Sequence, residues 1–354
     1  MNQQLRDLQQ ASGATFTDGT VTPGRFDPVS FGHEAVVMEA LAQGVAVCDR
    51  SSWGRIEVLG GDRIRFLHNQ TTNNFQILQP GQGCDTVFVT STGRTIDLAT
   101  AYVTESSVLM LVSPGYAQKL IDWMDRYIFF ADKVELKDVT ESTATFSVLG
   151  GGSDRLLEQL GLGAIAGQTP ASHQVLDLQG ISVRVAVGSG LTTPGYTLMV
   201  ADADAAQVWQ RLTEVSAIPM GSETWERLRI EQGRPVPGQE LTEEINPLEA
   251  GLWQTISLSK GCYIGQETIA RLHTYRGVKQ QLWGIRLQDK AEPNSPIQSG
   301  EEKIGTLTSV IAIDQGFLGL GYIRTKAVAA GLKVQVNGVA GELVPVPFVS
   351  HEYP

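Results

Sequence analysis

Apolar and polar residues alternate over short stretches between residues 55 and 140, and Gly, Asp, Ser and Pro separate these stretches. Alternation with a period of two predicts strands, and apolar positions three and four apart predict helices. The expected elements are, in chain order, a strand at 55–59, a helix at 64–69, strands at 86–90, 95–103 and 108–112, a helix from 113 to about 129 and a strand at 133–139. Ser113 and Pro114 supply the cap and the first-turn proline of the longer helix. The segment therefore predicts an α+β lobe.

The same order of elements recurs after residue 140, although the residues themselves differ. The expected elements are a strand at 145–149, a helix at 155–160 after a glycine-rich turn, strands at 181–187 and 196–200, and a helix at 203–215. A recurring order of elements indicates related structural units. We therefore expect two related α+β lobes, about residues 1–140 and 141–278, packed together.

The pattern changes again from about residue 280, where short apolar stretches alternate with glycine turns. Strands are expected at 282–287, 302–313, 318–323, 332–336 and 342–346. Such a series predicts a small β-barrel over residues 279–354. Helices are also expected near the N-terminus, at 28–43 and at 223–232.

Length and composition favour a folded protein of more than one domain. The chain has 354 residues, of which 42% are apolar and 18% charged, enough to bury a core and more than one core usually serves. Its formal net charge of −11 repels phosphate backbones and anionic lipid headgroups, so neither nucleic acid nor a membrane is an expected partner. No apolar run reaches the ~18 residues of a membrane span, and the N-terminus lacks a signal-peptide core, so we expect a cytoplasmic protein.

The three cysteines, Cys48, Cys84 and Cys262, lie far apart in the sequence. No C-x-x-C pair or neighbouring histidine completes zinc-type spacing, and an iron–sulfur cluster normally takes four thiolates. We therefore predict no metal site and no cluster held by this chain alone. The glycine-rich segment 161–167 does not fit the dinucleotide fingerprint, and no P-loop motif occurs.

Cys262 is the candidate reactive group. It lies in the run Lys260-Gly261-Cys262-Tyr263-Ile264-Gly265-Gln266-Glu267, and Arg271 and Arg276 follow downstream. Cationic neighbours favour the thiolate over the thiol. From local composition alone, a half-buried structural cysteine is the alternative interpretation.

The same run, followed by Ala270 and Arg271, is similar to the signature K-G-C-[FY]-x-G-Q-E-x-x-A-R of YgfZ-type proteins, a folate-binding branch of the glycine-cleavage T-protein (aminomethyltransferase) superfamily. The other similar segments are 66–73, 127–134, 228–235 and 246–252. The resemblance implies an α+β fold with two interleaved, pseudo-repeated folate-binding lobes over residues 1–278. A C-terminal antiparallel β-barrel completes a three-leaf ring around a folate pocket.

The implied cofactor is tetrahydrofolate or a one-carbon derivative. Its pterin edge requires a buried carboxylate, its benzoyl ring apolar or aromatic walls, and its glutamate tail cations. Asp97 is the pterin candidate, because it interrupts a strand of apolar or small residues. Residues 93–102 are similar to the T-protein element G-[RG]-[IV]-[LI]-D-D-L-x-V-Y. Asp97 matches its first acid, Leu98 replaces the second, and Tyr102 matches the final tyrosine. An exposed strand residue is the alternative from pattern alone.

A second T-protein element, Y-T-G-E-x-G-[YF]-E, is only partly kept in residues 191–197, which read L-T-T-P-G-Y-T. The glutamate that ligates folate in T-proteins is absent. We expect folate to bind through Asp97, Tyr196 and Arg229, with Trp225 as a wall of the ring site. A surface salt bridge is the alternative for Arg229, and a place in the core is the alternative for Trp225, as for Trp53 and Trp253.

Three functions remain open. The first is a tetrahydrofolate-binding accessory protein that supports assembly or repair of iron–sulfur clusters in other enzymes, with Cys262, Lys260 and Asp97 as catalytic candidates. The second is an aminomethyltransferase that transfers a one-carbon unit to tetrahydrofolate, in which Asp97 assists proton transfer. Leu98 and the missing glutamate weigh against it. The third is a folate-binding interaction module with an idle cysteine. The expected partners are a folate and iron–sulfur client or assembly proteins, and the resemblance favours a monomer.

Overall fold

The computed structural model describes residues 2–16 and 27–353. Its contacts divide the chain into two compact units. Unit 1 comprises Met1–Leu67, Phe75–Asp85 and Ala99–Trp225, and unit 2 comprises His68–Asn74, Thr86–Leu98 and Glu226–Pro354. Each unit is therefore assembled from segments that are distant in the sequence.

A six-stranded sheet with the order β11-β1-β7-β10-β9-β8 lies in unit 1. Its strands are β1 (Ala46–Asp49), β7 (Thr143–Leu149), β8 (His173–Leu178), β9 (Ile181–Val187), β10 (Gly195–Ala201) and β11 (Ile218–Met220). β1 and β11 pair in parallel, and the other neighbours pair antiparallel. The strands β1, β8 and β11 are absent from the elements expected from the sequence. β1 and β11 have 4 and 3 residues, too few for alternation to be recognised.

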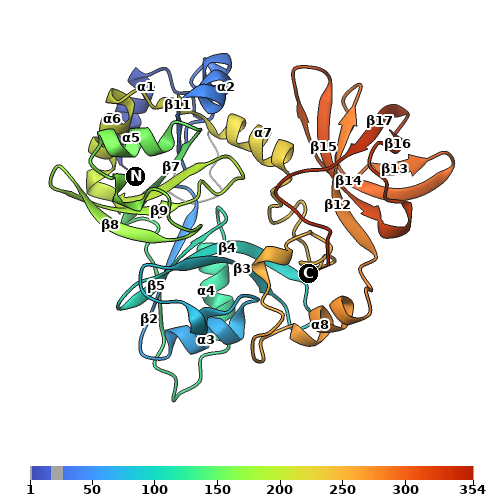
Figure 1. Cartoon of the computed structure of the whole chain (residues 1–354), viewed down its shortest axis with the longest axis horizontal. Coiled ribbons are helices and arrows are strands. Elements are labelled where there is room, and N and C mark those ends of the chain that lie inside the picture. Colours follow the sequence, from blue (N-terminus) through green and yellow to red (C-terminus); the bar gives the residue numbers. More distant parts are fainter. Residues whose placement is uncertain (1, 17–26, 354) are drawn as a thin grey trace. The chain divides into compact units, whose positions relative to one another are not determined.

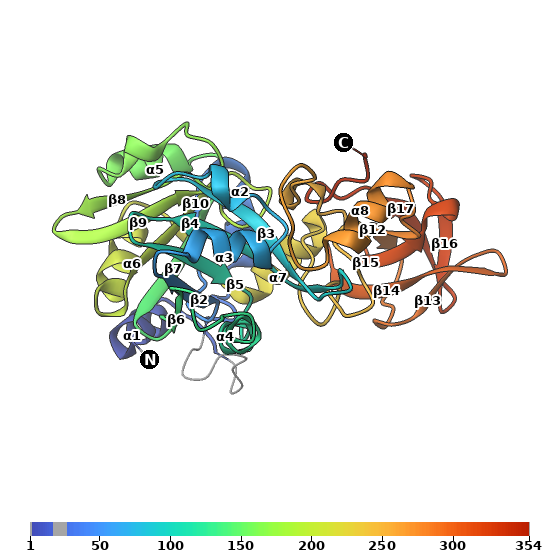
Figure 2. The ribbon, with the colours of Figure 1, turned by 90° about the horizontal axis from the view of Figure 1, so that it is seen from below.

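Four helices belong with this sheet: α1 (Gln3–Ala11), α2 (Glu34–Gln43), α5 (Ser153–Gln159) and α6 (Ala205–Glu214). α1 and α6 lie side by side (Figures 1 and 2). Apolar residues at helical spacing on α6, among them Val208, Trp209 and Leu212, are fully buried in the core. The Trp209 ring lies 5.6 Å from the ring of Phe146 on β7, which joins the helix layer to the sheet.

A five-stranded sheet has the order β3-β4-β5-β2-β6, in which the pairs β4–β5, β5–β2 and β2–β6 are antiparallel. Its strands and helices are β2 (Gly54–Leu59), α3 (Arg63–Gln70), β3 (Gly83–Val89), β4 (Thr95–Val103), β5 (Ser107–Val112), α4 (Ala117–Asp125) and β6 (Glu135–Asp138). α4 packs beside β2 and β6 (Figure 2). This helix begins at Ala117 and not at Pro114 as expected, because the Tyr116 N–H donates to the Ser113 carbonyl, 3.0 Å away, and closes a turn first.

The two sheets share one strand order, and the expected repeat is thereby confirmed. β3-β4-β5-β2 in the first sheet corresponds to β8-β9-β10-β7 in the second. The strand beside β2 is β6, whereas the strand beside β7 is β1, which precedes the first copy in the chain. The two lobes are therefore interleaved in sequence through this one exchanged position.

The C-terminal strands form a closed antiparallel barrel in unit 2, as expected, with the order β12-β15-β14-β13-β16-β17 (Figure 1, orange to red). The strands are β12 (Gln280–Leu287), β13 (Pro296–Ser299), β14 (Glu302–Ala312), β15 (Phe317–Arg324), β16 (Lys333–Val336) and β17 (Val339–Val344). Buried aliphatic residues such as Ile285, Leu307 and Ile323 fill this barrel. α7 (Ser222–Gln232) and α8 (Gln266–Thr274) precede it. The mixed α+β class with three sheets is thus established, and the ring arrangement and the domain boundaries stay predictions.

Candidate functional site

Cys262 lies in the loop that leads into α8, and its side chain is exposed. The other two cysteines differ from it, since Cys48 is buried and Cys84 is half-buried. Burial raises the pKa of the Cys48 thiol well above its usual range, and nearby Asp27 adds to this effect. Cys262 is therefore the cysteine that solution-phase reactants or a partner protein can reach most directly.

Lys260 anchors one end of this loop through hydrogen bonds of its side chain. Its side chain is buried, and its ammonium donates hydrogen bonds to the carbonyl oxygens of His68, Thr71 and Asn73, the last two at 2.8 and 2.6 Å. An ammonium has three N–H donors, which matches the three carbonyls. A cation also suits the C-terminal end of α3, where the helix dipole is negative. The contacts explain why a lysine occupies this place: it ties the Cys262 loop to the segment that follows α3.

Gly265 fixes the other end of the loop. Its φ angle is +79°, a backbone conformation that residues with a Cβ atom rarely adopt. A Cβ atom at Gly265 would also lie 2.7 Å from the Thr90 carbonyl oxygen and 2.9 Å from the Gly93 Cα. The Ile264 N–H donates to the Asn69 carbonyl at 3.0 Å. Gly265 thus allows the start of α8 to pack directly on the turn between β3 and β4.

His68 is a neighbour of this loop that the sequence analysis did not single out. Its imidazole is buried, and its Nε2 lies 3.8 Å from the position that a Cβ atom would take on Gly261. Burial lowers the pKa of His68, and the charge of Lys260 lowers it further. A neutral imidazole therefore lies next to the residue that precedes Cys262. The signal was present, since His68 lies within the similar segment 66–73.

Asp97, the predicted pterin ligand, lies on β4 in the part of that strand that belongs to unit 2. Its side chain is fully buried, so the exposed-strand alternative is excluded. A buried carboxylate costs several kcal/mol unless hydrogen-bond donors surround it. Asp97 thus has the burial that recognition of a pterin edge requires.

Arg229 lies on α7, and its side chain is fully buried within a cluster of polar partners. Its Nη1 donates to Glu240 at 2.9 Å and its Nε to Glu226 at 2.9 Å, and its Nη2 contacts Gln239 and, at 2.9 Å, Ser309. Burial opposes the charge, but the two carboxylates outweigh it and raise the pKa of Arg229. The interaction is thus no surface salt bridge, because the side chains of Arg229 and Glu240 are both 0% exposed.

Trp225 and Trp53 enclose an arginine in unit 1. The guanidinium carbon of Arg50 lies 3.7 Å from the centre of the Trp53 ring and 4.3 Å from that of Trp225. The two indoles meet edge to face at 6.0 Å. Arg50 Nη1 also donates to the Ser147 hydroxyl and the Ser189 carbonyl, both at 3.0 Å. The predicted ring wall is therefore a cation–π stack around an arginine that the sequence analysis missed.

The two candidate tyrosines also have partners within unit 1. The Tyr196 hydroxyl donates to Asp154 at 2.5 Å, and burial together with this carboxylate raises the tyrosine pKa far above its usual value. The Tyr102 ring meets the His173 ring edge to face at 5.5 Å. Burial likewise raises the pKa of Tyr102, so both phenols stay protonated near neutral pH.

The predicted residues thus fall into separate groups. Lys260 and Cys262 share one loop of unit 2, and Arg229 and Asp97 also belong to unit 2. Tyr102, Tyr196 and Trp225 belong to unit 1, where each contacts a different neighbour.

Two negative findings concern residues 2–16 and 27–353. No group of three or more His, Cys, Asp or Glu side chains gathers there as a metal site would. Within the same ranges, each helix is too short or too polar to cross a membrane.

Comparison with known proteins agrees with this architecture. A chloroplastic protein of Arabidopsis thaliana, which its name assigns provisionally to the transferases, is 45% identical over 353 residues, covering 99% of this chain and 80% of the relative. The aminomethyltransferase of Geobacillus kaustophilus is 27% identical over 345 residues and covers 93% of both chains.

The solved structure of the glycine-cleavage aminomethyltransferase T from Bartonella henselae has the same fold, with a TM-score of 0.84 and 17% identity over 99% of this chain and 98% of its own. The profile of the GCVT N-terminal domain matches residues 5–260. The chain is therefore a member of the GCVT-domain family.

Proposed function

We propose that this protein is a tetrahydrofolate-binding accessory protein of the YgfZ branch, which supports the assembly or repair of iron–sulfur clusters in other enzymes through Cys262. The observation that carries the proposal is the exposed Cys262 thiol on a loop held at both ends, by the Lys260 ammonium and by the close packing of Gly265. A fixed loop presents the thiol at constant geometry to a protein-bound cluster. The buried thiol of Cys48 lacks that access.

The folate part of the proposal is supported by Asp97. The carboxylate is fully buried, which suits the paired N–H donors of a pterin. Arg229 and Tyr196 already bind carboxylates of this chain, and the Trp225 ring already stacks on Arg50. On the strength of its burial and its match to the first acid of the T-protein element, we assign the pterin to Asp97, and we give Arg229, Tyr196, Tyr102 and Trp225 the role of shaping the surroundings of the folate. When bound, a reduced folate would supply one-carbon chemistry.

Complementation tests the thiol. In a bacterium that lacks its YgfZ protein, the wild-type chain should restore the activity of iron–sulfur enzymes, and Cys262→Ala should not. Cys84→Ala is the matched control, because it removes a half-buried thiol elsewhere and should rescue fully. Equal rescue by Cys262→Ala and the wild type would contradict the role of this thiol.

Titration with tetrahydrofolate, followed by tryptophan fluorescence, tests the cofactor. Asp97→Asn should weaken binding by about tenfold or more, since a charged hydrogen-bond acceptor contributes roughly 1.5–3 kcal/mol. Asp289→Asn, an exposed position beside the barrel, should leave the affinity unchanged. Unaltered binding by Asp97→Asn would remove Asp97 from the site.

An aminomethyltransferase is the second candidate, and the relatives named aminomethyltransferase favour it. Leu98 beside Asp97 and the missing glutamate in residues 191–197 argue against it. Glycine-dependent formation of methylene-tetrahydrofolate, measured with the other glycine-cleavage proteins, separates the two functions. Clear turnover would replace the accessory role as the main function.

The cytoplasmic location expected from the sequence belongs to the same proposal. The Arabidopsis thaliana relative is named as chloroplastic, so an organelle is the alternative. Fractionation of the source cells with an antibody against this chain would distinguish the two.

A further inference from the structure

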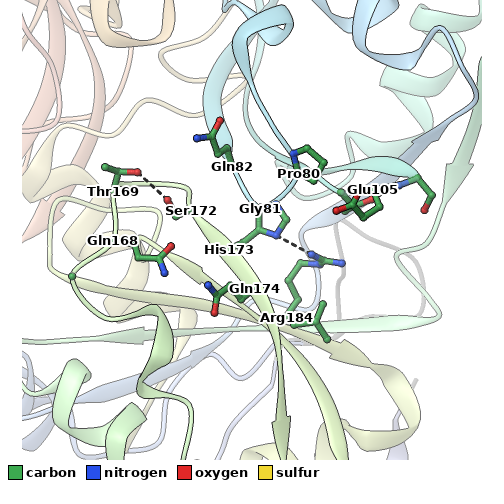
Figure 3. A pocket seen from close by; sticks show the side chains of 14 residues that line it. Pro80, Gly81, Gln82, Glu105, Gln168, Thr169, Ser172, His173, Gln174 and Arg184 are labelled. Atoms are coloured by element: carbon green, nitrogen blue, oxygen red, sulfur yellow. Dashed lines mark hydrogen bonds between the residues drawn. The ribbon is translucent and has the colours of Figure 1, made fainter.

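A pocket of ≈ 920 Å³ lies within unit 1, where the two pseudo-repeated copies meet (Figure 3). One wall comes from the segments beside β3 and β5, including Gln82 and Glu105, and the other from β8 and β9, including Gln174 and Arg184. Ligand pockets in proteins usually have volumes of roughly 300–1,000 Å³. The pocket therefore has the size of a small-molecule site, and none of the residues assigned to folate or to cluster chemistry lines it.

Arg184 is the only cation in the pocket lining, and a histidine orients it. Its Nη1 donates to His173 Nδ1 at 2.8 Å, as drawn in Figure 3. The opposite ring nitrogen, Nε2, lies 2.9 Å from the Val103 carbonyl oxygen. A carbonyl accepts only from a protonated nitrogen, and a guanidinium donates only to an unprotonated one, so His173 is the neutral Nε2–H tautomer. The buried imidazole thus holds the guanidinium in a single orientation.

Among the residues that the structure describes, the Arg184 guanidinium has no carboxylate partner, although partly buried arginines usually have one. Across residues 2–16 and 27–353, no carboxylate lies within ion-pair distance of Arg184, and His173 is its one hydrogen-bond partner. Burial lowers the pKa of Arg184, and only Glu57 opposes this through its charge. A partly desolvated guanidinium has five N–H donors in a fork that fits a carboxylate or phosphate. Most of these donors remain available to a ligand.

The lining also contains several polar side chains, and a backbone hydrogen bond connects its two walls. Gln82, Gln168 and Gln174 contribute amides to the lining, and Glu105, on the same wall as Gln82, contributes a carboxylate (Figure 3). The backbone N–H of His173 donates to the Gly81 carbonyl at 2.8 Å, and this hydrogen bond connects the two walls. The site is therefore preformed and joins one cation to several hydrogen-bonding amides.

We propose that this pocket binds a small metabolite through a carboxylate or phosphate group, which pairs with the Arg184 fork while the surrounding amides bind its polar remainder. His173 is the positioning residue for Arg184. The site is independent of the folate and cluster functions, so either can fail without the other.

Isothermal titration calorimetry of the full-length protein with inorganic phosphate and with citrate, at constant ionic strength, tests the proposal. Saturable binding with one site per chain is expected for at least one probe. Arg184→Gln should weaken it by about tenfold or more, equivalent to roughly 1.4 kcal/mol. Arg155→Gln, which removes an exposed arginine from α5 of the same unit, should not change it.

Gln174→Glu provides a second variant that leaves Arg184 in place and adds a repelling charge to the wall. It should weaken binding by a similar factor, and circular dichroism should show an unchanged fold. Which probe binds distinguishes a phosphate ligand from a carboxylate ligand. The absence of saturable binding for both probes up to about 10 mM, or equal binding by Arg184→Gln and the wild type, would overturn the proposal.

Discussion

Arg229 in unit 2 is fully removed from bulk water and Arg184 in unit 1 is partly removed from it, and the partners of their guanidinium groups differ. Arg229 is fully buried and is bound by Glu240, Glu226 and Ser309. Arg184 is half-buried at a pocket, and among the residues that the structure describes its guanidinium hydrogen-bonds only to the neutral imidazole of His173. The first arginine has its charge compensated inside the protein. The second arginine, Arg184, leaves most of its N–H donors available to a ligand.

The contrast teaches how to separate a structural cation from a binding cation. Charge and burial alone do not do so, because both arginines are desolvated. What separates them is the number of donors already used by the protein. By this criterion Arg229 and Lys260 stabilise the fold, and Arg184 is available for recognition.

The largest change in the free energy of unfolding is expected from Arg229→Met. It leaves Glu240 buried without its cation, which should lower the free energy of unfolding by about 3–5 kcal/mol. Urea denaturation measures this. Arg227→Met is the matched control on the same helix, since it removes more exposed ion pairs to Glu231 and Asp314 that contribute about 1 kcal/mol or less. Equal losses in both variants would contradict the comparison.

The second effect depends on pH and arises from His173. Burial lowers the pKa of His173 from 6.5 to about 4, and the charge of Arg184 adds to this. The unfolded chain therefore binds a proton between pH 6.5 and 4 that the folded chain does not. Stability should be unaffected by this group above pH 6.5 and fall as the pH drops to about 4, by up to about 3 kcal/mol.

His173→Gln tests this attribution, because an amide can replace the imidazole without titrating. The difference in unfolding free energy between wild type and variant should change with pH between 6.5 and 4 and be constant above 7. A pH-independent difference would mean that folding leaves the pKa of His173 unshifted, which would contradict the attribution.

A third effect concerns Lys260, the other cation whose donors are all used. Lys260→Met leaves three backbone carbonyls without their ammonium, so we expect a loss of about 2–3 kcal/mol in unfolding free energy. The released loop should also change the rate at which a thiol reagent modifies Cys262. Lys279→Met, which removes an exposed lysine after α8 in the same unit, serves as the control. A change in stability no larger than that of the control would contradict the tether.

The smallest effect on stability is expected from Arg184→Gln. Removing a desolvated cation that has no carboxylate partner in residues 2–16 and 27–353 should shift the unfolding free energy by about 1 kcal/mol or less. The same variant should lose anion binding. A loss of stability as large as that of Arg229→Met would show that the arginine is structural.

Much of the fold follows from local patterns. Alternating residues predict β4 and β15, and the recurring order of elements predicts the two similar sheets. β1 and β11 escape prediction because they are short. α8 escapes because its first residues, Gln266 and Glu267, belong to the signature run, which was interpreted as a chemical motif.

The sequence by itself determined most of the elements, the repeat, the barrel and the residues of the Cys262 loop, because these depend on neighbours along the chain. Only the tertiary structure decided what Lys260, Arg229 and Arg184 do. Their partners lie at distant positions: Lys260 contacts residues 68–73, and the pocket of Arg184 includes residues 80–82 and 104–106. Whether a cation stabilises the fold or binds a ligand depends on which acceptors folding brings to it. A local sequence pattern cannot predict these acceptors, because they come from distant parts of the chain.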